Sequence, residues 1–325
     1  MTEMELPSAV QALVEKGSVS ADDVLTLRKS VFNDGVVQRE EAGWIFAIQN
    51  AAKDVDPEWE TFFVEALVDM AVRQAEPYGY VSEESADWLI GELSSDGRIK
   101  NPLALDALIR VIDKAKSCPA RLPAFALEQV KYAVIEGQGP GRGPGLYVAG
   151  VVTEADVERL RGILYAFGGD GNVAVTRAEA EVLFDINDAT SAADNHAAWS
   201  DLFVKAVANY LMNVSGYAVP SRKEALRREA WVSYATPEIS SFFQRMLMGG
   251  LAGVMQAYSP VEAAEDREAR MAAAEEITEE EAKWLADRIG RDGDLHENEK
   301  ALLTFLADES PNVHPALQTL VDAVA

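Results

Sequence analysis

The chain has 325 residues, of which 48% are hydrophobic, and its formal net charge at pH 7 is -25. This length predicts two domains of ordinary size, each with its own core. The negative charge repels phosphate backbones and anionic lipid headgroups, which disfavours nucleic acids and membrane surfaces as partners and favours basic partners or cations. Solubility through self-repulsion and adaptation to a salty cytoplasm are alternative explanations of the same charge.

The only cysteine is Cys118, so an intramolecular disulfide is excluded and we expect a buried small side chain at this position. The first residues lack a basic region followed by a long apolar run, and no other stretch has the length and apolarity of a membrane span. A cytoplasmic, non-membrane protein is therefore predicted.

The first repeated helix is predicted to begin at Ser20. A hydroxyl side chain followed three positions later by a carboxylate is typical of a helix N-cap, and Ser20 and Asp23 form this pattern. The same pattern recurs at Thr153 and Thr278. These three positions are therefore interpreted as helix starts.

The segment that follows Trp59 has apolar residues at the spacing of one helix face, and an equivalent series follows Trp199. The two series are Trp59, Phe62, Phe63, Ala66, Leu67, Met70 and Ala71, and Trp199, Leu202, Phe203, Ala206, Val207, Tyr210 and Leu211. Stripes of this kind are usually core, so we expect both tryptophans to be core residues.

Two long segments of the chain repeat. Residues 81–97 align without a gap with residues 277–293, including a tryptophan and an Asp-Gly pair. Residues 19–35 align with 152–171, and the match continues through Glu41-Ala42 and Glu179-Ala180 to Trp59 and Trp199. This order predicts an all-α fold made by tandem duplication of a two-unit helical module, giving two helical bundles.

A glycine- and proline-rich run, residues 137–145, separates the two halves. Such a run cannot continue a helix and suits a linker. The predicted domains are therefore residues 1–136 as the first helical module, 137–150 as a Gly/Pro linker, and 151–325 as the second helical module with an insertion at about 220–276. A phosphate-binding role for the run is disfavoured because no Gly-Lys-Ser/Thr follows it.

The Asp-Gly pairs are predicted to end helices of about three turns, because glycine readily adopts the left-handed conformation. Two loops share the pattern Asp-Gly-x-apolar-x-x-x-Glu, at residues 34–41 and 292–299. This pattern resembles the second half of an EF-hand loop and is also similar to the helical repeat of TerB-like tellurite-resistance domains. The resemblance implies a helix–loop–helix geometry and, as one functional option, a response to divalent metal.

The ligand positions argue against four working calcium loops. An EF-hand places oxygen ligands at loop positions one, three and five, and a bidentate Glu at twelve. Positions one and three are Ser30 and Phe32 in the first loop, and Arg288 and Gly290 in the last. The other two loops have Leu103 and Arg177 at position twelve. The alternative is structural, in which the Asp caps backbone amides and the Glu begins the next helix.

One loop concentrates acidic and imidazole groups in a register unlike that of an EF-hand. We name Asp292, Asp294, His296 and Glu299 as candidate metal ligands, and a divalent cation is the only cofactor that the sequence suggests. A solvated acidic loop is the alternative explanation.

The duplication is interrupted in the second half. After Gly216-Tyr217 the chain inserts residues 220–276, which have no counterpart after Gly79-Tyr80. A helix over about 237–258 is predicted there, next to a basic cluster. It is either additional core or a docking helix, and the candidate partner-binding residues are Phe242, Phe243, Met246, Leu247, Arg227 and Arg228.

No catalytic constellation is found. His196, His296 and His314 share no motif, and neither Cys118 nor any serine lies in a known nucleophile context. The sequence therefore predicts a non-enzymatic acidic helical protein, a protein-binding or scaffolding module with a protein partner. A divalent-metal-responsive protein of the TerB-like or EF-hand-like kind is the alternative. The pattern specifies neither the partner nor the oligomeric state.

Overall fold

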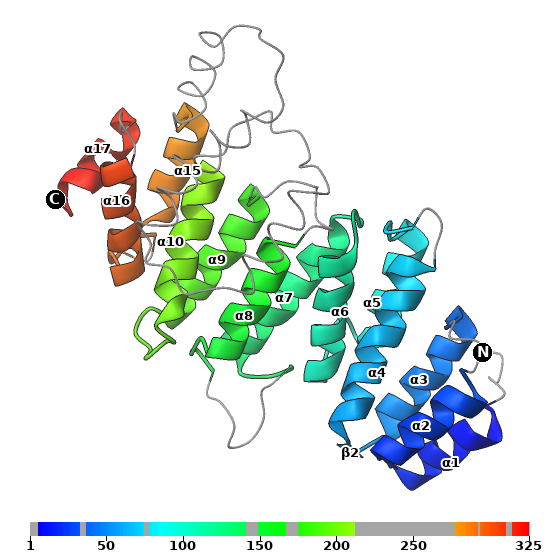
Figure 1. Ribbon diagram of the computed structural model, residues 1–325. Helices are drawn as coiled ribbons and strands as arrows, with labels where there is room; N and C mark the ends of the chain where they lie inside the picture. Colours follow the sequence, from blue (N-terminus) through cyan, green and yellow to red (C-terminus); the bar gives the residue numbers. More distant parts are fainter. Residues whose placement is uncertain are drawn as a thin grey trace, which may run out of the picture. The chain divides into compact units, whose positions relative to one another are not determined.

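The structure is a computed structural model, and it describes residues 6–32, 37–74, 78–140, 149–166, 175–211, 277–291, 293–309 and 314–324. Over these ranges the secondary structure is helical apart from one pair of two-residue strands and isolated bridges (Figure 1). The predicted all-α fold class is confirmed. No helix in the described ranges has the length and apolarity needed to cross a membrane.

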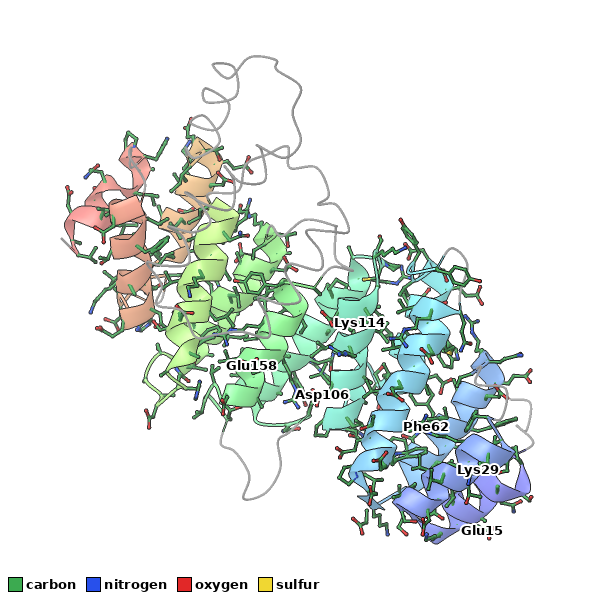
Figure 2. All side chains as sticks on the ribbon, in the orientation of Figure 1. Glu15, Lys29, Phe62, Asp106, Lys114 and Glu158 are labelled. Carbon is green, nitrogen blue, oxygen red and sulfur yellow. The ribbon has the colours of Figure 1, made fainter. Side chains whose placement is uncertain are left out.

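The chain divides into two compact units. The first unit comprises residues 1–149 and 158–171, and the second comprises 150–157 and 172–325. The division falls inside a helix, because residues 158–164 have their contacts mainly within the first unit. Arg159 donates two hydrogen bonds, of 2.7 and 3.2 Å, to the carboxylate of Asp106, which is labelled in Figure 2.

The first unit is a helical bundle in which α4 packs against α6, and α1 packs against α3. Strands β1 and β2 pair in parallel; β1 follows α1 in the chain and β2 follows α3. The elements are α1 (Ser8–Lys16), β1 (Ser18–Val19), α2 (Ala21–Ser30), α3 (Arg39–Ala51), β2 (Asp54–Val55), α4 (Pro57–Val68), the π-helix η1 (Asp69–Arg73), α5 (Glu83–Leu93), α6 (Pro102–Lys114) and α7 (Arg121–Glu136).

In the second unit, α10 packs against α16, and α15 packs against α17. The described helices are α8 (Glu154–Leu164), whose later residues belong to the first unit, α9 (Arg177–Thr190), α10 (Ala198–Leu211), α15 (Glu279–Arg288), α16 (Glu297–Glu309) and α17 (Pro315–Asp322). The pairing of α4 with α6 and of α10 with α16 involves helices at corresponding places in the aligned halves.

The predicted helix starts are confirmed by side-chain caps. At Ser20, Thr153 and Thr278 the hydroxyl accepts a hydrogen bond from the backbone N–H three residues later, and the carboxylate at that position accepts one from the N-cap N–H. These bonds satisfy backbone donors that a helix leaves unpaired at its N-terminus. Each cap of this kind stabilises its helix by about 1 kcal/mol.

The two aromatic stripes form the cores of their units. Trp59 has no exposed surface and Trp199 is 1% exposed, and the phenylalanines that follow each of them on the same face are also buried. Full burial of one such side chain contributes about 1.5 to 3 kcal/mol. Cys118, a free cysteine, is buried as expected.

The helix before the Asp96-Gly97 pair ends earlier than the sequence predicted. Helix α5 ends at Leu93, and Ser95 and Arg98 then exchange two backbone hydrogen bonds, of 2.9 and 3.0 Å. Asp96 and Gly97 both have positive φ, 54° and 70°. Two consecutive residues with positive φ form the tight turn that closes a hairpin. The pair is therefore a turn between helices and does not cap α5.

Candidate functional site

The predicted docking segment lies outside the residues that the structure describes. The insertion at 220–276, the predicted helix at 237–258 and all six candidate partner-binding residues lie outside the described residues. The docking helix stays a prediction.

Three of the four candidate metal ligands are described, and one of them has a clear structural role. Glu299 is 1% exposed, and its two carboxylate oxygens accept hydrogen bonds from the backbone N–H groups of His296, at 2.8 Å, and Gly290, at 3.1 Å. It therefore joins the loop to the first turn of α16. Within the described ranges no group of three or more His, Cys, Asp or Glu side chains is placed to hold a metal ion. Asp292 lies outside these ranges, so the metal site stays a prediction.

The aligned halves place the same aromatic groups around Trp88 and Trp284. The ring of Phe46 meets Trp88 edge to face at 5.7 Å, and the ring of Phe184 meets Trp284 edge to face at the same 5.7 Å. Such contacts contribute about 0.5 to 1.5 kcal/mol beyond burial. The guanidinium carbon of an arginine lies 5.6 Å from the Trp88 ring and 5.9 Å from the Trp284 ring; these residues are Arg39 and Arg177.

The second unit closes the surface around its tryptophan. Trp284 is 6% exposed, its indole N–H donates to the Glu181 carboxylate, and Tyr210 packs on it edge to face at 5.0 Å. Burial and then the Glu281 carboxylate raise the pKa of Tyr210 above its ordinary value. A network of ion pairs between α9 and α15 lies on the same side of the unit.

The centre of that network is Arg288, which is 5% exposed. Its guanidinium pairs with Glu181, Asp185 and Asp188 on α9 and lies 5.3 Å from the Phe184 ring. Three carboxylates and one aromatic face therefore hold a single cation. A hollow of about 400 Å³ remains beside Arg288, lined also by Asp185, Asp188, Ala189 and Arg291, but Trp284 does not line it.

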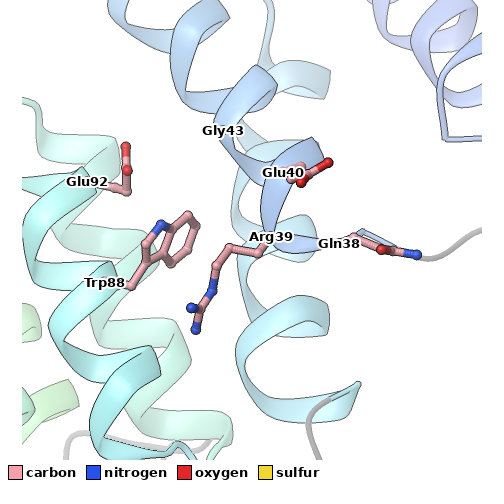
Figure 3. Close-up of a pocket in the computed structure, with 6 residues that line it drawn as sticks. All are labelled: Gln38, Arg39, Glu40, Gly43, Trp88 and Glu92. Atoms are coloured by element: carbon pink, nitrogen blue, oxygen red, sulfur yellow. The ribbon is translucent and has the colours of Figure 1, made fainter. Parts of the chain in front are cut away.

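The first unit leaves the corresponding space open. Where the aligned second half has Glu181 the first half has Gly43, and where it has Arg288 the first half has Glu92. The result is a hollow of about 520 Å³ between α3 and α5, lined by Gln38, Arg39, Glu40, Gly43, Trp88 and Glu92 (Figure 3). We call it the Trp88 hollow.

Trp88 is the aromatic wall of this hollow. Figure 3 shows its indole projecting from α5 toward the start of α3, with the Arg39 side chain beside the ring and Glu92 one turn further along α5. The indole is partly exposed, and its N–H donates no hydrogen bond to any described residue. The indole N–H is therefore available to a ligand, and a ligand cation competes with Arg39 for the ring.

The charged groups of the hollow are weakly constrained. Arg39 pairs with Glu84, but the two side chains are 45% and 80% exposed, and exposed ion pairs contribute about 0 to 1 kcal/mol. Glu92 pairs with no cation among the described residues, in contrast to Arg288 at the aligned position. With Glu40, the lining carries one arginine and two carboxylates, so its formal charge is negative.

The chemistry of the lining is suited to binding. Its six residues include no histidine, cysteine or serine, so neither a nucleophile nor an imidazole base faces the hollow. Sequence reasoning named neither Trp88 nor Glu92 as a site residue. The signal was present in the aligned repeats, in which Gly43 aligns with Glu181 and Glu92 aligns with Arg288.

Comparisons with protein-family models, with curated proteins and with solved structures find no match to this chain. The resemblance to TerB-like repeats and to EF-hand loops is therefore neither supported nor opposed by them.

Proposed function

We propose that this chain is a non-catalytic protein-binding module of the cytoplasm, and that the Trp88 hollow is where it holds a partner. The observation that carries the proposal is the contrast between the halves. Aligned helices present the same Trp, Phe and Arg groups. In the second unit Glu181 accepts the Trp284 indole N–H and the nearby hollow does not include Trp284, whereas in the first unit Trp88 lines an open hollow.

The glycine that borders the hollow lowers the stability of α3. Gly43 lies inside α3, and glycine in a helix interior destabilises by about 0.5 to 1 kcal/mol relative to alanine. A glutamate at the aligned position of α9 avoids most of that loss. A role in binding accounts for a glycine at this position, since a partner side chain needs the space.

The matched contacts also support an origin by tandem duplication, with the units differing at one surface. On this proposal the second unit keeps the fold and the first unit carries the binding site. The net charge of -25 favours a basic protein over a nucleic acid as partner.

The proposal is tested by giving the first unit the side chains of the second. The hollow-filled variant Gly43→Glu/Glu92→Arg changes the net charge by +1, and Glu60→Gln, an exposed change on α4, changes it by the same amount. Tagged full-length chains are compared for the proteins that they retain from source-cell extract, by quantitative mass spectrometry. We expect a partner retained by the wild type and by Glu60→Gln and lost by the hollow-filled variant.

Thermal unfolding of the hollow-filled variant provides the control for folding, and its midpoint should equal or exceed that of the wild type. Equal retention of every protein by the filled and unfilled chains would show that the hollow is not the binding site.

A further inference from the structure

We infer that the occupant of the Trp88 hollow is the side chain of an arginine, presented by a basic segment of the partner protein. This inference rests on the proposed function and specifies the chemistry of the ligand. Three observations on the described residues support it: the aromatic face of Trp88, the unpaired carboxylate of Glu92, and the arginine that the second unit places at the aligned site.

The aromatic face favours a cation. Positive groups are attracted to the face of an indole, and arginine does this most often because its planar guanidinium also stacks on the ring. The unit itself shows the compatibility, since Arg39 lies 5.6 Å from the Trp88 ring centre and is fixed only by an exposed ion pair with Glu84.

The carboxylate of Glu92 supplies the counter-charge. It lies one helical turn beyond Trp88 on α5 and lines the same hollow. A guanidinium can donate two parallel hydrogen bonds to one carboxylate, an arrangement that an ammonium group does not reproduce. An arginine that enters beside Trp88 can therefore also pair with Glu92.

The second unit contains a related arrangement in which the chain itself supplies the arginine. There Arg288, at the position aligned with Glu92, places its guanidinium 5.3 Å from the Phe184 ring and among the carboxylates of α9. The space between the two helices thus accommodates a guanidinium against an aromatic ring when the chain supplies one. In the first unit the glycine and the reversed charge leave this group to be supplied by another molecule.

The test uses the full chain and two small probes, N-acetyl-argininamide and its neutral isostere N-acetyl-citrullinamide. Binding is followed through the indole N–H resonance of Trp88 in ¹H–¹⁵N NMR spectra, assigned with Trp88→Phe. A single side chain should bind with Kd on the order of 10 mM. We expect the citrulline probe to bind at least about tenfold more weakly, because it lacks the positive charge.

Variants with opposite expected effects separate recognition from a general loss of structure. Glu92→Gln should weaken the arginine probe several-fold, whereas Arg39→Gln should strengthen it, because it removes a competing cation and releases Glu84. Glu60→Gln should leave the affinity unchanged, and the hollow-filled variant should show no saturable shift.

Equal binding of the two probes, equal affinity in the wild type and Glu92→Gln, or the absence of a saturable shift in the wild type would each overturn the arginine inference. These outcomes are distinct from failure of the proposed function. A partner that is lost with the hollow-filled variant while the probes bind equally leaves the site in place and rejects only the arginine.

Discussion

The two tryptophan surfaces of this protein share a scaffold and differ in what completes them. Trp88 and Trp284 each pack edge to face with a phenylalanine and lie near the guanidinium of an arginine, both from the preceding aligned helix. Near Trp284 the chain supplies a buried arginine with three carboxylates; near Trp88 it supplies a glycine and a glutamate that pairs with no cation in the part of the chain that the structure describes. The aromatic contacts are thus alike in the two units, while the polar residues beside them differ and decide whether the tryptophan lines a hollow.

The largest difference in stability between the two units should appear when the side chains of Arg288 and of the aligned Glu92 are each truncated to alanine. Arg288→Ala leaves Glu181, Asp185 and Asp188 close together without a cation, and breaking a fully buried pair costs about 3 to 5 kcal/mol. These carboxylates are 37%, 42% and 27% exposed, so water compensates in part and we expect a loss of about 2 kcal/mol.

The matched change Glu92→Ala in the first unit should alter stability by less than about 0.5 kcal/mol. Urea unfolding followed separately through a reporter in each unit measures both values. Equal losses at the two positions would contradict the distinction between a closed and an open surface.

A difference of at most similar size is expected at the core tryptophans. The indole N–H of Trp59 donates to Gln49 at 2.6 Å, whereas the indole N–H of Trp199 and the side-chain amide nitrogen of Asn187 have no hydrogen-bond partner among the described residues. Gln49→Leu should destabilise the first unit by about 1 to 3 kcal/mol, because it leaves a buried donor unpaired.

Asn187→Leu should change the stability of the second unit by less than about 1 kcal/mol, since it removes a polar group that is already unsatisfied. It also removes the acceptor of the Asn298 amide, which is partly exposed and can bond to water. The same unfolding experiment applies, and a larger loss at Asn187 than at Gln49 would reverse the comparison.

The smallest effect is expected for metal ions. If the Asp-Gly loops are structural in both halves, thermal melts with calcium, magnesium or chelator should coincide apart from small screening effects. Glu299 supports this expectation, because both of its oxygens already accept backbone hydrogen bonds. A saturable shift of several degrees at micromolar metal, removed by Glu299→Gln, would instead establish the cation site predicted at Asp292, Asp294, His296 and Glu299.

The sequence by itself determined the helical fold, the capping boxes and the buried stripes. These features are local: a hydroxyl and a carboxylate three residues apart satisfy each other within one turn, and apolar spacing defines a face before any neighbour is known. The helix starts at Ser20, Thr153 and Thr278 and the burial of Trp59 and Trp199 follow from these rules.

Only the tertiary structure decided the site. Gly43 and Glu92 lie 49 positions apart in the sequence, and neither residue marks a site by its local pattern. Their significance arises because α3 and α5 face each other, so that a missing side chain on one and a carboxylate on the other border one space beside Trp88. Packing between helices depends on contacts between residues distant in sequence, whereas capping and periodicity do not. The caps and the buried faces could therefore be predicted, and the meeting of Gly43 with Glu92 could not.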